Sequence, residues 1–67
     1  MNILENHLYN LLMQLVEEHK SLWRIKNMYK KDAENCEKCL QFFEKLERDK
    51  EEHIKELLEL IKSHMME

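Results

Sequence analysis

The sequence predicts an all-α fold, an antiparallel helical hairpin that dimerises into a four-helix bundle. The first observation is that the 67 residues contain no glycine and no proline, which disfavours β-hairpins and long ordered loops. The second is a heptad repeat with position a at Leu8, because apolar residues at positions a and d indicate helices that pack on helices. The third is length: so short a chain buries too little apolar surface alone, so we expect a second copy.

We interpret residues 1–67 as one domain. The spacing of its apolar residues predicts two helices. The first is expected over about residues 3–31, where leucines recur every three or four positions. The turn is expected over about residues 32–35, with Asp32 as N-cap and Asn35 as the residue that best tolerates positive φ. The second helix is expected over about residues 33–65. One uninterrupted helix is the alternative, but it would be roughly 100 Å long, which is unusual in globular domains.

Charged or titratable residues interrupt the heptad at Glu18, Asp32, Lys50, His53 and His64. Folding the chain about residue 34 brings together residues whose numbers sum to about 68, so Glu18 is expected to face Lys50 in a polar core layer with His53. Because a buried carboxylate or ammonium is costly unless paired, a Glu18–Lys50 contact is expected. Such a layer can fix register and oligomeric state. The same rule pairs Leu15 with His53, Ile25 with Phe43, and Tyr29 with Cys39.

The polar layer can also be interpreted as a metal site. Four-helix bundles hold metals with carboxylate and histidine side chains from facing helices. Asp49 and His53 lie one helical turn apart and could reach one ion, with Glu18 on the other helix and Glu52 beside them. Lys50 argues against this interpretation, because an ammonium repels a cation and competes for the carboxylate. We therefore expect no cofactor, with iron or another divalent metal as the alternative.

Two stretches resemble a known family. They are Met28-Tyr-Lys-Lys-Asp-Ala-Glu34, and Phe42 to Ile61 with its acidic-His-Ile and Leu-Leu pattern. Over about residues 17–62 the chain resembles a rubrerythrin-type ferritin-like helix pair, and also the single hairpin of encapsulated ferritins, which dimerises to complete a four-helix bundle. The resemblance implies an iron site to which His53 would contribute. The family's glutamate positions fall on Lys50 and Leu22, with Glu18 one turn before the latter.

Cys36 and Cys39 form a C-x-x-C motif at positions a and d. We expect buried free thiols that pack as small apolar residues. A zinc site would need two more ligands, from histidines or from a second chain, and paired chains could instead gather four thiols. A redox motif would favour a strand-to-helix setting, which this pattern lacks. Because two such cysteines cannot staple a small secreted fold and no targeting segment is recognised, a cytoplasmic location is expected.

Charge and motif content narrow the function. The net charge is −3 with both signs interspersed, which gives no case for binding nucleic acid or an anionic membrane. No stretch approaches the roughly 20 apolar residues of a membrane span. No nucleophile–base pair or phosphate-binding loop is recognised, so we expect no enzymatic activity. The sequence predicts a self-associating assembly or interaction module, partnered by itself or by another helical protein, with a metal-binding ferritin-like bundle as the alternative.

Overall fold

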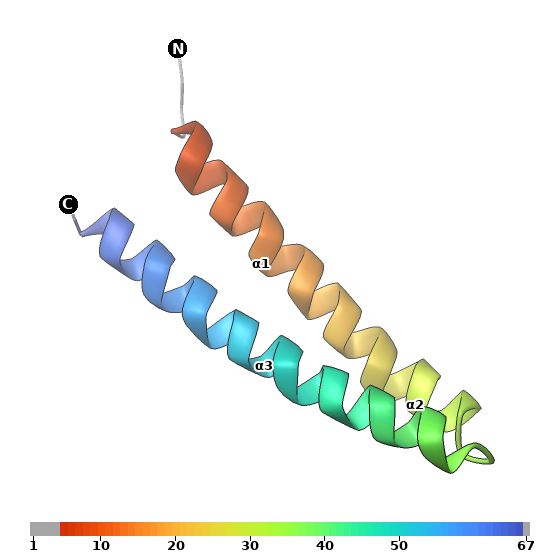
Figure 1. Cartoon of the computed structure of the whole chain (residues 1–67). Coiled ribbons are helices and arrows are strands. Elements are labelled where there is room, and N and C mark those ends of the chain that lie inside the picture. The colour runs from red at the N-terminus through yellow and green to blue at the C-terminus, as the bar shows by residue number, and fades with distance from the viewer. Residues whose placement is uncertain (1–4, 67) are drawn as a thin grey trace.

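The computed structural model describes residues 5–66, which form two antiparallel helical arms joined by a tight turn (Figure 1). The first arm consists of α1 (Asn6–Arg24), the π-helical turn η1 (Ile25–Tyr29) and α2 (Lys30–Asp32), and the second arm is α3 (Glu37–Met65). The largest dimension is 51 Å, about half the length of one uninterrupted helix. The predicted hairpin is confirmed, and the single-helix alternative is wrong.

The turn differs in detail from the prediction. Asp32 ends α2 instead of capping the next helix, and residues 33–35 form the turn. Cys36 is the N-cap of α3, with an extended backbone (φ −126°, ψ 97°). No residue between 5 and 66 has a positive φ, so Asn35 does not play the predicted role. The expected first helical residues, 3 and 4, lie outside the described part of the chain.

The face of α3 that packs on the first arm keeps position a of the predicted heptad, at Phe43, Lys50 and Leu57, but combines it with position e instead of position d. On α1 the predicted seam holds, and Glu18 is buried there, as is Ile25 at the start of η1. On α3, however, the predicted d positions Cys39, His53 and Leu60 are exposed. A hairpin permits this change of phase because the turn resets the rotation of the second helix. The observed seam of α3 consists of buried and half-buried residues, namely Leu40, Phe43, Glu47, Lys50, Ile54, Leu57, Ile61 and His64.

The π-helical turn η1 adjusts the first arm before the chain reverses. Asn27 Nδ2 donates a hydrogen bond to the Trp23 carbonyl oxygen at 2.9 Å, close to the point where the backbone changes its hydrogen-bonding period. The Tyr29 ring lies 5.4 Å from the ring of Phe43. The pairing rule placed Tyr29 opposite Cys39, and both residues line one pocket together with Phe43.

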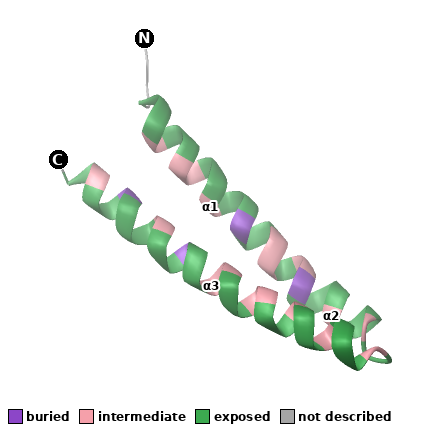
Figure 2. Cartoon of the chain, in the orientation of Figure 1, coloured by how far each residue is buried: buried purple, intermediate pink, exposed green. Residues whose placement is uncertain are grey.

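The core of the hairpin is narrow. Ile25, Ile54 and Ile61 are the buried apolar residues of the described chain, and Figure 2 shows buried positions as isolated bands on the facing sides of the two arms. The two arms alone therefore leave most of their apolar side chains in contact with solvent.

The described helices contain no segment that combines the length and hydropathy needed to cross a lipid bilayer.

Candidate functional site

A buried carboxylate is held between the two arms by two cationic or titratable partners. Glu18 of α1 is 5% exposed. Lys50 of α3 donates from Nζ to Glu18 Oε2 at 2.8 Å, and His53 Nδ1 lies 2.5 Å from Glu18 Oε1. Both carboxylate oxygens are thus engaged by one helix, which crosslinks the arms near their middle. The pairing predicted for Glu18 and Lys50 is confirmed, and His53 joins them in the predicted polar layer through its contact with Glu18.

The electrostatics of this layer favour an ionised Glu18. Burial alone raises the pKa of a carboxyl group, because it removes water from the charged form. At Glu18 the hydrogen bonds and positive charges of Lys50 and His53 outweigh burial, so the pKa of Glu18 lies below its ordinary value. A carboxylate with two donors in this geometry is the arrangement expected of a stable buried ion pair.

The residues proposed as metal ligands are only partly brought together. His53 reaches Glu18, but Asp49 and Glu52 are exposed positions of α3, and Glu52 forms an ion pair with Lys55 (3.8 Å). Within residues 5–66, no three His, Cys, Asp or Glu side chains gather in a way that could hold one ion. The Lys50 ammonium lies 2.8 Å from Glu18 Oε2, where its positive charge opposes the binding of a cation.

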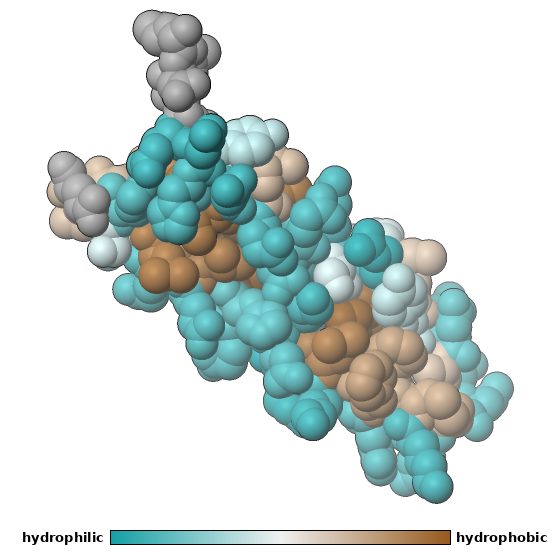
Figure 3. Space-filling view, turned by 45° about the horizontal axis from the view of Figure 1, so that its top comes forward, coloured by the Kyte–Doolittle hydropathy of each residue, from teal (hydrophilic) through white to brown (hydrophobic). Residues whose placement is uncertain are grey.

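An open pocket of about 410 Å³ lies over the polar layer, lined in part by Gln14, Glu18, His53 and Leu57. Figure 3 shows one face of the molecule, on which hydrophilic side chains separate two apolar areas, one toward the chain ends and one toward the turn.

Comparison with known proteins adds no relative. No protein-family model, curated protein or solved structure matches the chain. The resemblance to rubrerythrin-type hairpins therefore stays a prediction from residues 17–62, and the arguments below use the geometry of this chain alone.

A second titratable cluster, which the sequence did not reveal, lies at the open end of the hairpin. His64 Nε2 is 2.7 Å from Glu5 Oε2, and the rings of His64 and His7 meet edge to face with centroids 5.2 Å apart. His64 is far from Glu5 and His7 in the sequence, and the signals for the contact were its place in the heptad and the pairing rule, which brings residue 64 close to residue 5. The cluster joins the start of α1 to the end of α3.

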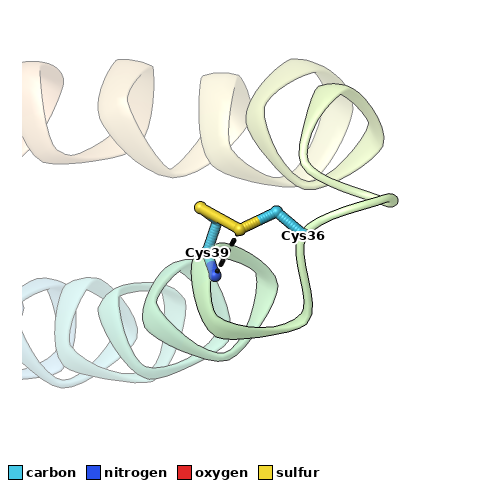
Figure 4. Close-up of a disulfide and its surroundings, with 2 residues drawn as sticks. All are labelled: Cys36 and Cys39. Atoms are coloured by element: carbon cyan, nitrogen blue, oxygen red, sulfur yellow. Dashed lines mark hydrogen bonds between the residues drawn. A yellow bond between two sulfur atoms is a disulfide. The ribbon is translucent and has the colours of Figure 1, made fainter.

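The cysteine prediction is wrong. Cys36 and Cys39 are not buried free thiols but form a disulfide, and Cys39 is exposed while Cys36 is half-buried. Figure 4 shows the disulfide on the side of α3 that is turned toward the first arm. The two residues line an open pocket of about 310 Å³ together with Tyr29 and Phe43. The error arose because the motif was placed inside a helix, whereas Cys36 is the N-cap.

Proposed function

We propose that this chain is a non-enzymatic assembly module, a helical hairpin that associates with a second copy of itself. The observation that carries the proposal is a set of exposed and half-buried apolar side chains that lie outside the hairpin seam. We call it the outer face and define it by residues of α1 and α3, namely Tyr9, Leu12, Val16, Trp23, Leu58 and Met65.

The α1 part of the outer face follows from spacing and exposure. Tyr9, Val16 and Trp23 repeat every seven residues, so they lie along one side of α1, and Leu12 falls beside them at helical spacing. Val16 is 44% exposed and Trp23 is 59% exposed. Solvated side chains of this size, aligned over the length of a helix, are typical of an interaction surface.

The α3 part of the outer face is located by an ion pair. Lys26 Nζ and Glu51 Oε2, 3.6 Å apart, mark one flank of the hairpin. Leu12 precedes Lys26 by two heptads, and Leu58 and Met65 follow Glu51 by one and two heptads. Residues separated by whole heptads lie on nearly the same side of a helix. Both arms therefore contribute apolar residues to the same flank.

A second copy is the occupant that the area of the hairpin favours. The chain exposes 5556 Å², whereas a compact monomer of 8.3 kDa exposes roughly 4,600 Å². Its radius of gyration is 15.3 Å, against roughly 11 Å for a compact chain of this length. The excess surface, roughly 1,000 Å², is comparable to the roughly 800 Å² that each partner buries in a standard interface. Pairing two outer faces would add the missing core.

The Glu18–Lys50 pair has a defined role in this proposal. Apolar seams alone allow neighbouring helices to slide, whereas a buried polar contact is satisfied in one alignment only. With Lys50 Nζ 2.8 Å from Glu18 Oε2, the two arms are held at one register. That register in turn fixes how Leu12 of α1 and Leu58 of α3 lie relative to each other within the outer face.

Sedimentation equilibrium of the full chain at micromolar concentration tests the proposal. We expect a mass of twice 8.3 kDa or a higher multiple, unchanged by EDTA, because association rests on apolar burial and not on a metal. A single-chain mass throughout the micromolar range would contradict the proposal. A multiple that dissociates on addition of EDTA would instead favour the metal-binding bundle with His53 and nearby carboxylates.

A further inference from the structure

The Cys36–Cys39 disulfide does not hold the hairpin together. Its two cysteines are separated by 3 positions and both lie at the start of α3. The arms are joined by other contacts, including the Lys30–Glu47 ion pair at 2.8 Å and the Glu18 contacts. A disulfide between neighbouring residues of one helical turn links no separate elements, so its place in the fold calls for a chemical explanation.

The position of Cys36 favours a thiolate when the disulfide is reduced. Cys36 is the N-cap of a helix of 29 residues, and its Sγ accepts a hydrogen bond from the backbone N–H of Cys39 at 3.2 Å. Unpaired N–H groups and the helix dipole stabilise negative charge at this end, which lowers the pKa of a thiol. Asp32 lines the same pocket and Glu37 lies in the first turn, and both oppose this effect. The N–H of Cys39 stabilises the Cys36 sulfur through a direct hydrogen bond, whereas the two carboxylates act on it through their charge.

The two cysteines differ in access. Cys39 is exposed, whereas Cys36 is half-buried, and both border the open pocket near the turn, with the Tyr29 and Phe43 rings on its apolar side. An approaching thiolate therefore meets Cys39 first. Attack at Cys39 releases Cys36, the sulfur that the helix N-terminus stabilises as a leaving group.

We propose that Cys36 and Cys39 form a thiol–disulfide exchange site that oxidises a dithiol of a partner protein. One thiolate of the dithiol attacks Cys39 Sγ, and the electron pair of the broken Cys36–Cys39 bond leaves on Cys36 Sγ. The second thiolate of the dithiol then attacks the partner's sulfur that is bonded to Cys39 Sγ, which closes a disulfide in the partner and releases Cys39 as a thiolate. The partner loses two electrons and two protons. The chain gains the electrons, and the protons pass to Cys39 and to Cys36 or solvent.

Equilibration of the oxidised full chain with graded mixtures of reduced and oxidised glutathione tests the site, with alkylation and intact mass as the readout. Because a stabilised thiolate favours the reduced form, we expect the pair to become half-reduced within the range of these mixtures. A structural disulfide would stay oxidised in every mixture, and that result would overturn the proposal.

Single-cysteine variants test the role of the helix N-terminus. In Cys39→Ser the remaining Cys36 thiol should ionise at lower pH than the Cys39 thiol of Cys36→Ser, measured by thiolate absorbance. It should also react faster with iodoacetamide at neutral pH, by roughly threefold for each unit of pKa difference. Serine is itself a favoured N-cap, so circular dichroism should show both variants helical. Equal ionisation of the two thiols would overturn the assignment.

Discussion

Replacing Lys50 with leucine is expected to lower the free energy of unfolding by about 2–3 kcal/mol, although leucine suits a helix seam. The reason is that Glu18, 5% exposed, would lose the ammonium bound to its Oε2, and an uncompensated buried charge is strongly destabilising. The loss should fall short of the largest known values because His53 remains on the other oxygen. Urea unfolding followed by circular dichroism, at one fixed protein concentration, measures the effect.

A double variant separates the charge from the packing. Glu18→Leu combined with Lys50→Leu should be as stable as the parent chain or more stable, because well-packed apolar residues often replace a buried ion pair without loss. If the Lys50→Leu single variant were as stable as the parent chain, the Glu18–Lys50 contact would not be a stabilising part of the hairpin.

The pH dependence of the same variants gives an independent check. The pKa of Glu18 is lowered in the folded chain, so its stabilisation is present above the ordinary carboxyl pKa and is lost as pH falls through the folded value. The difference between the parent chain and Lys50→Leu should therefore shrink in acid, where a protonated Glu18 needs no cationic partner. A difference that stays constant with pH would point to lost packing of the lysine stem instead.

Glutamate at position 16 is expected to weaken self-association by roughly 100-fold or more, equivalent to about 2.7 kcal/mol. Val16 is 44% exposed in the single hairpin, so the Val16→Glu variant should keep its helical content. Its carboxylate would be buried without a partner if two outer faces meet. Dissociation constants from sedimentation equilibrium measure the effect.

Asn10→Glu is the matched control for this variant. It introduces the same side chain on the same helix, at an exposed position on a different side of α1. We expect its dissociation constant to stay close to that of the parent chain. Equal weakening by the two variants would show that added negative charge, and not the outer face, determines association.

Much of the fold could be predicted from heptad spacing, but the phase of α3 could not. Leu8, Leu11 and Leu15 lie on the face of α1 that the heptad predicted. The Glu18–Lys50 contact was also predictable, because a buried charge needs a partner of opposite sign. The seam of α3 through Ile54 and Ile61 depends on the rotation set by the turn. Ile54 and Ile61 occupy position e of the predicted heptad, next to position d, and that rotation brings position e into the seam in place of position d.

The cysteine site shows how one boundary error changes the chemistry inferred. With Asp32 as N-cap, Cys36 and Cys39 fall inside a helix and appear as core residues. In the structure Asp32 closes the first arm, and Cys36 takes the N-cap position. N-cap preference favours Asp over Cys, so local propensity predicted the wrong residue. The geometry of the turn decided between them.

The emission of Trp23 over a concentration series tests most directly whether the outer face is the interface. The chain contains one tryptophan, which is 59% exposed in the single hairpin and lies within the outer face. We predict that its emission maximum shifts to shorter wavelength as concentration rises from nanomolar to micromolar, in step with the mass from sedimentation, and that Val16→Glu suppresses the shift. Association without any change in Trp23 emission would contradict the account.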